Sequence, residues 1–174
     1  MPQLIMNWEN DGAAPETVEL PEDCTLVRLP QMENAVNEWL DILYKGITSE
    51  RRDEAYFQSR MVEHFDYDPN QCFFVLVNGT AAATFSVFCN RETKSGYIHM
   101  VSCKEEYRGR GIGTLMCRLI VKDLKENGMR NAYLTTDDFR IPAIRSYLRA
   151  GFVPDESTDD FRVRWKAIRE LIGQ

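Results

Sequence analysis

The sequence predicts an α+β protein in which helices flank one mixed, mostly antiparallel central sheet. Two observations predict this fold class. Residues 72–103 contain three apolar segments rich in Val, Ile, Phe and Tyr that turn residues separate, a pattern typical of an antiparallel meander. After residue 103 the chain alternates between segments with helical periodicity and short apolar segments, which indicates strands linked by helices on the same sheet.

The first part of the chain contains two candidate strands, "LIMNW" at residues 4–8 and "CTLVRL" at residues 24–29. The loop-like stretch between them, rich in acidic residues, Gly and Pro, suggests a boundary. We therefore expect residues 1–23 to be an N-terminal extension that can add a strand, and residues 24–174 to form a single domain.

Two helices and the meander follow. Apolar residues recur at helical spacing over residues 32–43, and a second helical stretch is predicted over about residues 49–65. The strands of the meander are predicted at residues 72–77, 80–89 and 97–103, with the hairpin signal Asn-Gly between the first two.

The last part of the chain begins with a helix whose apolar face runs over residues 112–124 and which ends near Gly128. A short strand is predicted at residues 131–136. A further helix carries Pro142 in its first turn, where proline is well tolerated. The segment "FRVRWKAI" at residues 161–168 alternates apolar and basic residues, which predicts a final strand.

Composition excludes several classes of function. The 174 residues are 44% hydrophobic and 28% charged, as in an ordinary globular protein, and show no apolar run long enough to span a bilayer. The net charge of −6 argues against a nucleic-acid partner. The five cysteines are scattered and form no CxxC pair, which argues against both a disulfide framework and a metal site. We expect a cytoplasmic protein without a membrane or nucleic-acid partner.

The segment "YRGRGIGTLM" at residues 107–116 places a glycine-rich turn directly before a helix. The first N–H groups of a helix have no partner within it, and together with the helix dipole they form a site for anions. Glycine allows close approach of a phosphate, and Arg108 and Arg110 add charged donors. The spacing fits neither GxGxxG nor GxxxxGK[ST], so a nucleotide hydrolase or a Rossmann fold is disfavoured.

Two motifs in this order resemble the GNAT superfamily of acetyl-coenzyme A-dependent N-acyltransferases. The first is Gln/Arg-x-x-Gly-x-Gly/Ala, which Arg108, Gly111 and Gly113 match. The second lies on the later helix and its end, where the matching residues are Ala143, Ile144, Tyr147, Gly151 and Phe152. The resemblance covers roughly residues 73–154 and implies a GNAT-like fold with a splayed strand pair at the coenzyme site.

The resemblance implies acetyl-CoA as the acyl-donor cosubstrate, with no metal. It implies that a loop binds the pyrophosphate, mainly through backbone N–H groups, and that the loop consists of Arg108, Gly109, Arg110, Gly111, Ile112, Gly113 and Thr114. It also implies that the pantetheine arm contacts the backbone of the preceding strand at Val101, Ser102 and Cys103.

The resemblance further implies a catalytic role for Tyr147, whose phenol would protonate the leaving thiolate. A tyrosine packed on the sheet is the structural alternative. One departure concerns Arg140, which stands where many relatives carry an asparagine that contacts the coenzyme. Arginine at this position could reach a phosphate or face solvent.

The general base is a choice among His99, Asp137 and water. His99 lies on the strand expected to contact pantetheine, and a strict period of two places it on one face with Tyr97, Val101 and Cys103. A neutral imidazole there could accept a proton directly or through water. A histidine that only forms hydrogen bonds within the sheet is the alternative.

The sequence therefore predicts an N-acetyltransferase that moves an acetyl group to a primary amine by direct attack through a tetrahedral intermediate. The alternative is a non-catalytic module that senses acyl-CoA. The acceptor is expected to be a small molecule or a peptide amine, and the protein a monomer or a homodimer.

Overall fold

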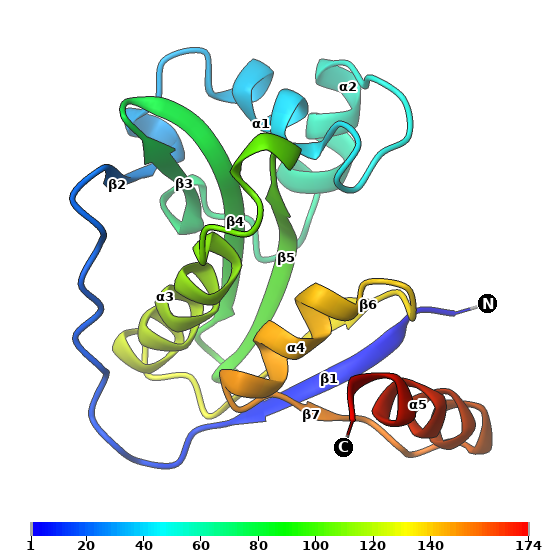
Figure 1. Ribbon diagram of the computed structural model, residues 1–174. Helices are drawn as coiled ribbons and strands as arrows, with labels where there is room; N and C mark the ends of the chain where they lie inside the picture. Colours follow the sequence, from blue (N-terminus) through cyan, green and yellow to red (C-terminus); the bar gives the residue numbers. More distant parts are fainter. Residues whose placement is uncertain (1, 174) are drawn as a thin grey trace.

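The computed structural model describes residues 2–173 and is centred on a seven-stranded sheet (Figure 1). The strands are β1 (Leu4–Glu9), β2 (Cys24–Arg28), β3 (Cys72–Val77), β4 (Thr80–Asn90), β5 (Ser95–Cys103), β6 (Asn131–Thr136) and β7 (Val153–Pro154). Their order in the sheet is β2-β3-β4-β5-β6-β1-β7. All neighbours are antiparallel except β5 and β6, which are parallel. The predicted mixed, mostly antiparallel sheet is confirmed.

Helices cover both faces of the sheet. They are α1 (Ala35–Leu43), α2 (Glu54–Phe57), α3 (Ile112–Glu126), α4 (Ile141–Arg149) and α5 (Asp159–Ile172). The larger apolar core lies between one face and α3, α4 and α5, while a smaller core lies between the other face and α1 and α2. A single π-helical turn, Gln58–Val62, continues α2, so the predicted second helix is shorter and begins later than expected.

The C-terminal segment forms helix α5, and the prediction of a final strand at residues 161–168 is wrong. Thr158 caps the helix by accepting a hydrogen bond from the N–H of Phe161. Phe161, Trp165 and Ile168 are buried at helical spacing. Val163, which the alternating pattern placed on the same face as Phe161, is 69% exposed. The alternation of apolar and basic residues covers too few positions to distinguish a strand from a helix.

The N-terminal strand β1 lies inside the sheet, between β6 and β7. It pairs with β6 along its whole length, from Leu4 opposite Thr136 to Glu9 opposite Asn131. Figure 1 shows the chain leaving β1 and running along the outside of the molecule, past α3, to β2 at the other edge. Three ion pairs hold this linker to α3 and the loop before it: Asp11–Lys125, Glu16–Arg118 and Asp23–Arg110.

Candidate active site

The parallel strands β5 and β6 separate halfway along their length. Their pairing runs from Ser95 opposite Asn131 to Ile98 opposite Leu134 and then ends. Beyond this point β5 continues to Cys103, still paired with β4 but no longer with β6. The result is a wedge between two strands, open toward the glycine-rich loop that follows β5.

A β-bulge lies in the splayed part of β5. Met100 has a φ of 51°, and the register with β4 shifts at this point because β5 holds an extra residue. The bulge reverses the alternation of side chains. Ser102 donates from Oγ to the carbonyl of Ile42 in α1, at 3.0 Å, whereas Val101 and Cys103 pack in the core beneath α3 and α4. The expectation that His99 shares a face with Val101 and Cys103 is therefore wrong.

The glycine-rich loop ends at the N-terminus of α3. Gly109 and Gly111 have φ values of 76° and 81°, and a Cβ on either would meet nothing within 4 Å. Gly111 is the N-cap residue of α3 and supplies no side-chain cap, so the first N–H groups of the helix are left for another partner. This bare helix terminus at the open end of the wedge can bind an anionic group.

The two arginines of the loop bind within the protein. Arg110 donates from Nη2 to Oδ2 of Asp23 at 2.7 Å and lies over the ring of Tyr107. Arg108 donates from Nε to the carbonyl of Cys103 at 3.2 Å. Arg110 is thus paired with a carboxylate, whereas Arg108, which is exposed, uses only its Nε and keeps its Nη donors for another partner.

Tyr147 points from α4 into the larger core and is 7% exposed. Its ring packs edge-on against Phe152, with centroids 6.0 Å apart. Burial raises the pKa of its phenol above the usual value, and the nearby Cys117 thiol adds to this rise. The Tyr147 hydroxyl is therefore a neutral donor near pH 7.

His99 lies in an aromatic cluster on the face covered by α1 and α2. Its Nε2 is 2.9 Å from the carbonyl oxygen of Arg60, and its Nδ1 is 3.1 Å from the hydroxyl of Tyr97. A carbonyl oxygen only accepts, so Nε2 carries the proton and Nδ1 accepts from Tyr97. Burial lowers the pKa of His99 to about 4, so the ring is neutral. The rings of His64 and Tyr133 stack on Tyr97.

Tyr97 is a candidate functional residue that the sequence analysis did not select. It belongs to the last pairs of β5 with β6 before the strands separate, opposite Tyr133. Its hydroxyl reaches along the strand toward His99, and therefore toward the wedge. The available signal was its position two residues before His99 on the same strand, which places both side chains on one face.

The acidic residues after β6 are committed to ion pairs. Asp137 accepts from Nε of Arg140 at 2.9 Å and from the amide of Gln3 at 3.2 Å. Asp138 pairs with Arg164 of α5, and this hydrogen bond lowers the pKa of the Asp138 carboxyl. Neither Asp137 nor Asp138 is therefore a free carboxylate.

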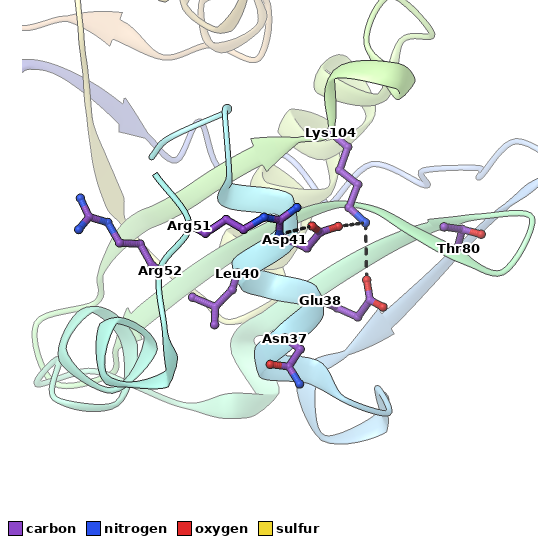
Figure 2. Close-up of a pocket in the computed structure, with 8 residues that line it drawn as sticks. All are labelled: Asn37, Glu38, Leu40, Asp41, Arg51, Arg52, Thr80 and Lys104. Carbon is purple, nitrogen blue, oxygen red and sulfur yellow. Dashed lines mark hydrogen bonds and ion pairs between the residues drawn. The ribbon is translucent and has the colours of Figure 1, made fainter. Parts of the chain in front are cut away.

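A surface pocket of about 410 Å³ lies beside α1. Its lining residues are Asn37, Glu38, Leu40, Asp41, Arg51, Arg52, Thr80 and Lys104. Figure 2 shows Lys104 between the carboxylates of Asp41, at 2.8 Å, and Glu38, at 3.6 Å, while Arg51 reaches Asp41 from the other side. These ion pairs attach Lys104, the residue directly after β5, to α1. They therefore help to hold the end of β5, which leads into the glycine-rich loop.

Residues 2–173 contain no group of three or more His, Cys, Asp or Glu side chains arranged to hold a metal ion. No helix in that part of the chain is both long and apolar enough to cross a membrane.

Known proteins share this arrangement. A family model described as "Acetyltransferase (GNAT) family" matches residues 34–152. The matched part runs from the N-cap of α1 to the residue before β7, and so includes the wedge, the glycine-rich loop and α4.

Individual relatives agree with the family match. N-alpha-acetyltransferase MAK3 of Arabidopsis thaliana is 30% identical over 89 residues, which are 49% of this chain and 46% of that protein. The chain thus matches about half the length of this relative.

Solved structures show the same fold. The GCN5-related N-acetyltransferase from Sphaerobacter thermophilus has a TM-score of 0.69 and 20% identity, covering 89% of this chain and 50% of that chain. The ribosomal-protein-S18-alanine N-acetyltransferase from Escherichia coli has a TM-score of 0.61 and 18% identity, covering 75% of this chain and 77% of that chain.

Proposed function

Because the chain belongs to the GNAT family of acetyltransferases, we propose that it transfers an acetyl group from acetyl-CoA to a primary amine. The observation that carries this proposal is the wedge between β5 and β6, which opens onto the bare N-terminus of α3. Coenzyme A is a narrow chain that ends in phosphates, and a molecule of this shape fits a channel that leads to a helix N-terminus. Bound there, acetyl-CoA supplies an activated thioester.

The protein's part in binding the coenzyme is assigned chiefly to its backbone. N–H groups of the loop from Arg108 to Thr114 would receive the pyrophosphate, because Gly109 and Gly111 leave open space in front of them. The edge of β5 that no longer pairs with β6, at Val101, Ser102 and Cys103, would hold the pantetheine arm. Gly113 lies close to α4, since a Cβ there would be 3.6 Å from Oγ of Ser146.

Tyr147 is assigned the role of general acid. Attack by the amine on the thioester carbonyl forms a C–N bond, and the C–S bond then breaks. The departing sulfur needs a proton, which a neutral phenol can give. The raised pKa of Tyr147 keeps its proton in place until that moment.

The pair of Tyr97 and His99 is assigned the role of general base. The Tyr97 oxygen would take the proton that the amine nitrogen loses as its bond to the acetyl carbon forms, while its own proton moves toward Nδ1 of His99, 3.1 Å away. Because the pKa of His99 is about 4, the imidazolium would be transient and would pass its proton on to solvent. The hydrogen bond from Nε2 to Arg60 fixes the tautomer that leaves Nδ1 free to accept. His99 thus acts through Tyr97, because both of its ring nitrogens have partners.

The acceptor is proposed to be the amine of a polypeptide or of a small cationic molecule. Two similar proteins are an N-alpha-acetyltransferase and a ribosomal-protein-S18-alanine N-acetyltransferase, which favours a polypeptide amine. The net charge of −6 would attract either kind of cation. All five cysteines are free thiols, and we propose a reducing compartment, the cytoplasm.

A turnover screen tests this function. The protein is mixed with acetyl-CoA and a panel of amines that includes short peptides with free N-termini, polyamines and amino acids, and release of free thiol is followed. Acetylated product that grows with acceptor concentration supports the enzyme. Tight binding of acetyl-CoA without turnover on any amine favours the non-catalytic sensor instead.

A further inference from the structure

The chain makes a compact turn directly after α1, over residues 44–48, here named the post-α1 turn. The carbonyl of Leu43 accepts hydrogen bonds from three N–H groups, those of Gly46, Ile47 and Thr48, at 3.2, 2.8 and 3.0 Å. The N–H of Lys45 donates to the carbonyl of Thr48 at 2.7 Å and closes the turn. These bonds hold Gly46 at its tip in one place.

Three parts of the candidate active site meet at Gly46. A Cβ on this residue would lie 2.4 Å from Oγ of Ser102 in the splayed part of β5 and 3.6 Å from Nη2 of Arg108 in the glycine-rich loop. From the other side of the wedge, Arg140 donates from Nη1 to the carbonyl of Gly46 at 2.8 Å. The turn therefore touches the elements that follow both splayed strands.

Two hydrogen bonds fix the orientation of the Arg140 guanidinium beside Gly46. It is the N-cap residue of α4, and its Nε donates to Asp137 at 2.9 Å while its Nη1 holds Gly46. Asp137 is itself held by Gln3. The guanidinium has five donors in a rigid plane, so it can make both bonds at once, which an ammonium on a flexible chain cannot do in the same geometry. Its Nε and Nη1 are thus already bonded to Asp137 and Gly46.

We propose that Arg140 is a positioning residue that ties the post-α1 turn across the open end of the wedge, so that the turn forms one wall of the channel for the acyl donor. The tie is a property of the protein alone. The statement that the channel holds an acyl donor rests on the proposed function. Arg140 then contributes to donor binding through the turn, and it does so whether or not the donor carries phosphates.

Two replacements break the tie in different ways. Arg140→Lys keeps the charge but loses the planar fork, and Arg140→Gln loses both the charge and the reach. The matched control is Arg145→Gln, an exposed arginine on the same helix. Hydrogen bonds of a charged donor are worth about 1.5–3 kcal/mol, which corresponds to a change of at least about 10-fold in an equilibrium constant.

The first measurement is amide hydrogen exchange of residues 44–48 in the protein without coenzyme. We expect at least about 10-fold faster exchange in both Arg140 variants and no change in the Arg145→Gln control. The second measurement is KM for acetyl-CoA and for S-acetyl-pantetheine, which lacks phosphates. We expect KM to rise by a similar factor for both donors in the Arg140 variants, with a smaller change in kcat.

Each result separates one explanation from the others. Unchanged exchange in Arg140→Gln would show that the tie does not hold the turn and would overturn the proposal. A KM that rises for acetyl-CoA alone would instead make Arg140 a direct phosphate ligand, which also overturns it. If the wild-type protein turns over no amine, the proposed function fails, and the exchange rates still decide whether the tie exists.

Discussion

The hydroxyl of Tyr147 can be removed without disturbing the packing of its ring. Tyr147→Phe keeps the edge-on contact with Phe152 and loses only the proton that the leaving sulfur needs. We expect kcat to fall by about 100-fold or more, in the range for a lost general acid, with affinity for acetyl-CoA nearly unchanged. Steady-state kinetics and a coenzyme titration measure both. The defect should shrink with a donor whose leaving thiol is more acidic, and wild-type turnover in Tyr147→Phe would remove this residue from the mechanism.

The neutral state of His99 links its hydrogen bonds to the pH dependence of stability. Its pKa is lowered from 6.5 to about 4 by burial, so the unfolded chain binds the proton more readily than the fold does. The contribution of neutral His99 to the free energy of unfolding is fully present above about pH 6.5 and is lost as the pH falls to about 4. The loss is about 3 kcal/mol, at 1.36 kcal/mol per pKa unit. His99→Gln keeps a donor for Arg60 and an acceptor for Tyr97 without titrating.

Denaturant unfolding of the wild type and His99→Gln between pH 4 and 7 tests this linkage. The wild type should lose stability relative to the variant as the pH falls. The comparison with the variant is needed because a second group titrates between pH 4 and 7. Burial raises the pKa of Asp123 to about 6, so the contribution of Asp123 to the free energy of unfolding falls as the pH rises through this range. A stability difference between wild type and variant that does not depend on pH would contradict the neutral buried state of His99.

At the scale of elements, the N-terminus of α3 is the part whose role can be tested most directly. A Cβ on Gly113 would be 3.6 Å from Oγ of Ser146, which is ordinary contact, so Gly113→Ala should fold and bind coenzyme A. Gly113→Asp adds a negative charge in the first turn of α3, beside the N–H groups where we place the phosphates. Its coenzyme affinity should fall by at least about 30-fold, since disrupting a buried charged contact costs about 2–5 kcal/mol. Calorimetric titration of both variants measures this, and equal affinities would argue against a phosphate site at α3.

The elements that could be predicted are those with local signals. The hairpin of β3 and β4, the apolar stripe of α3 and the helix that carries Tyr147 follow from turn residues and from periodicity. The bulge at Met100 has no such signal, because its positive φ is imposed by the pairing of β5 with β4. The post-α1 turn and its tie to Arg140 depend on contacts between distant parts of the chain, which no local pattern records.

At the scale of the whole molecule, the place of β1 bears on the predicted boundary at residue 23. Leu4, Met6 and Trp8 of β1 are buried in the larger core. Burial of one such side chain is worth about 1.5–3 kcal/mol, against a total stability of about 5–15 kcal/mol for a domain. We therefore expect a protein of residues 24–174 to lose its cooperative thermal transition. Scanning calorimetry of this fragment and the full chain decides the point, and equal melting temperatures would show that residues 1–23 are dispensable.

The position of β1 also sets the order in which the molecule can be completed on the ribosome. The strand is the first part of the fold to be synthesised, yet both of its neighbours, β6 and β7, lie beyond residue 130. While the intervening residues emerge, the apolar side of the nascent strand has no native partner, and such exposed segments are prone to aggregate or to bind chaperones. The sheet can close around β1 only after β6 and β7 have been synthesised.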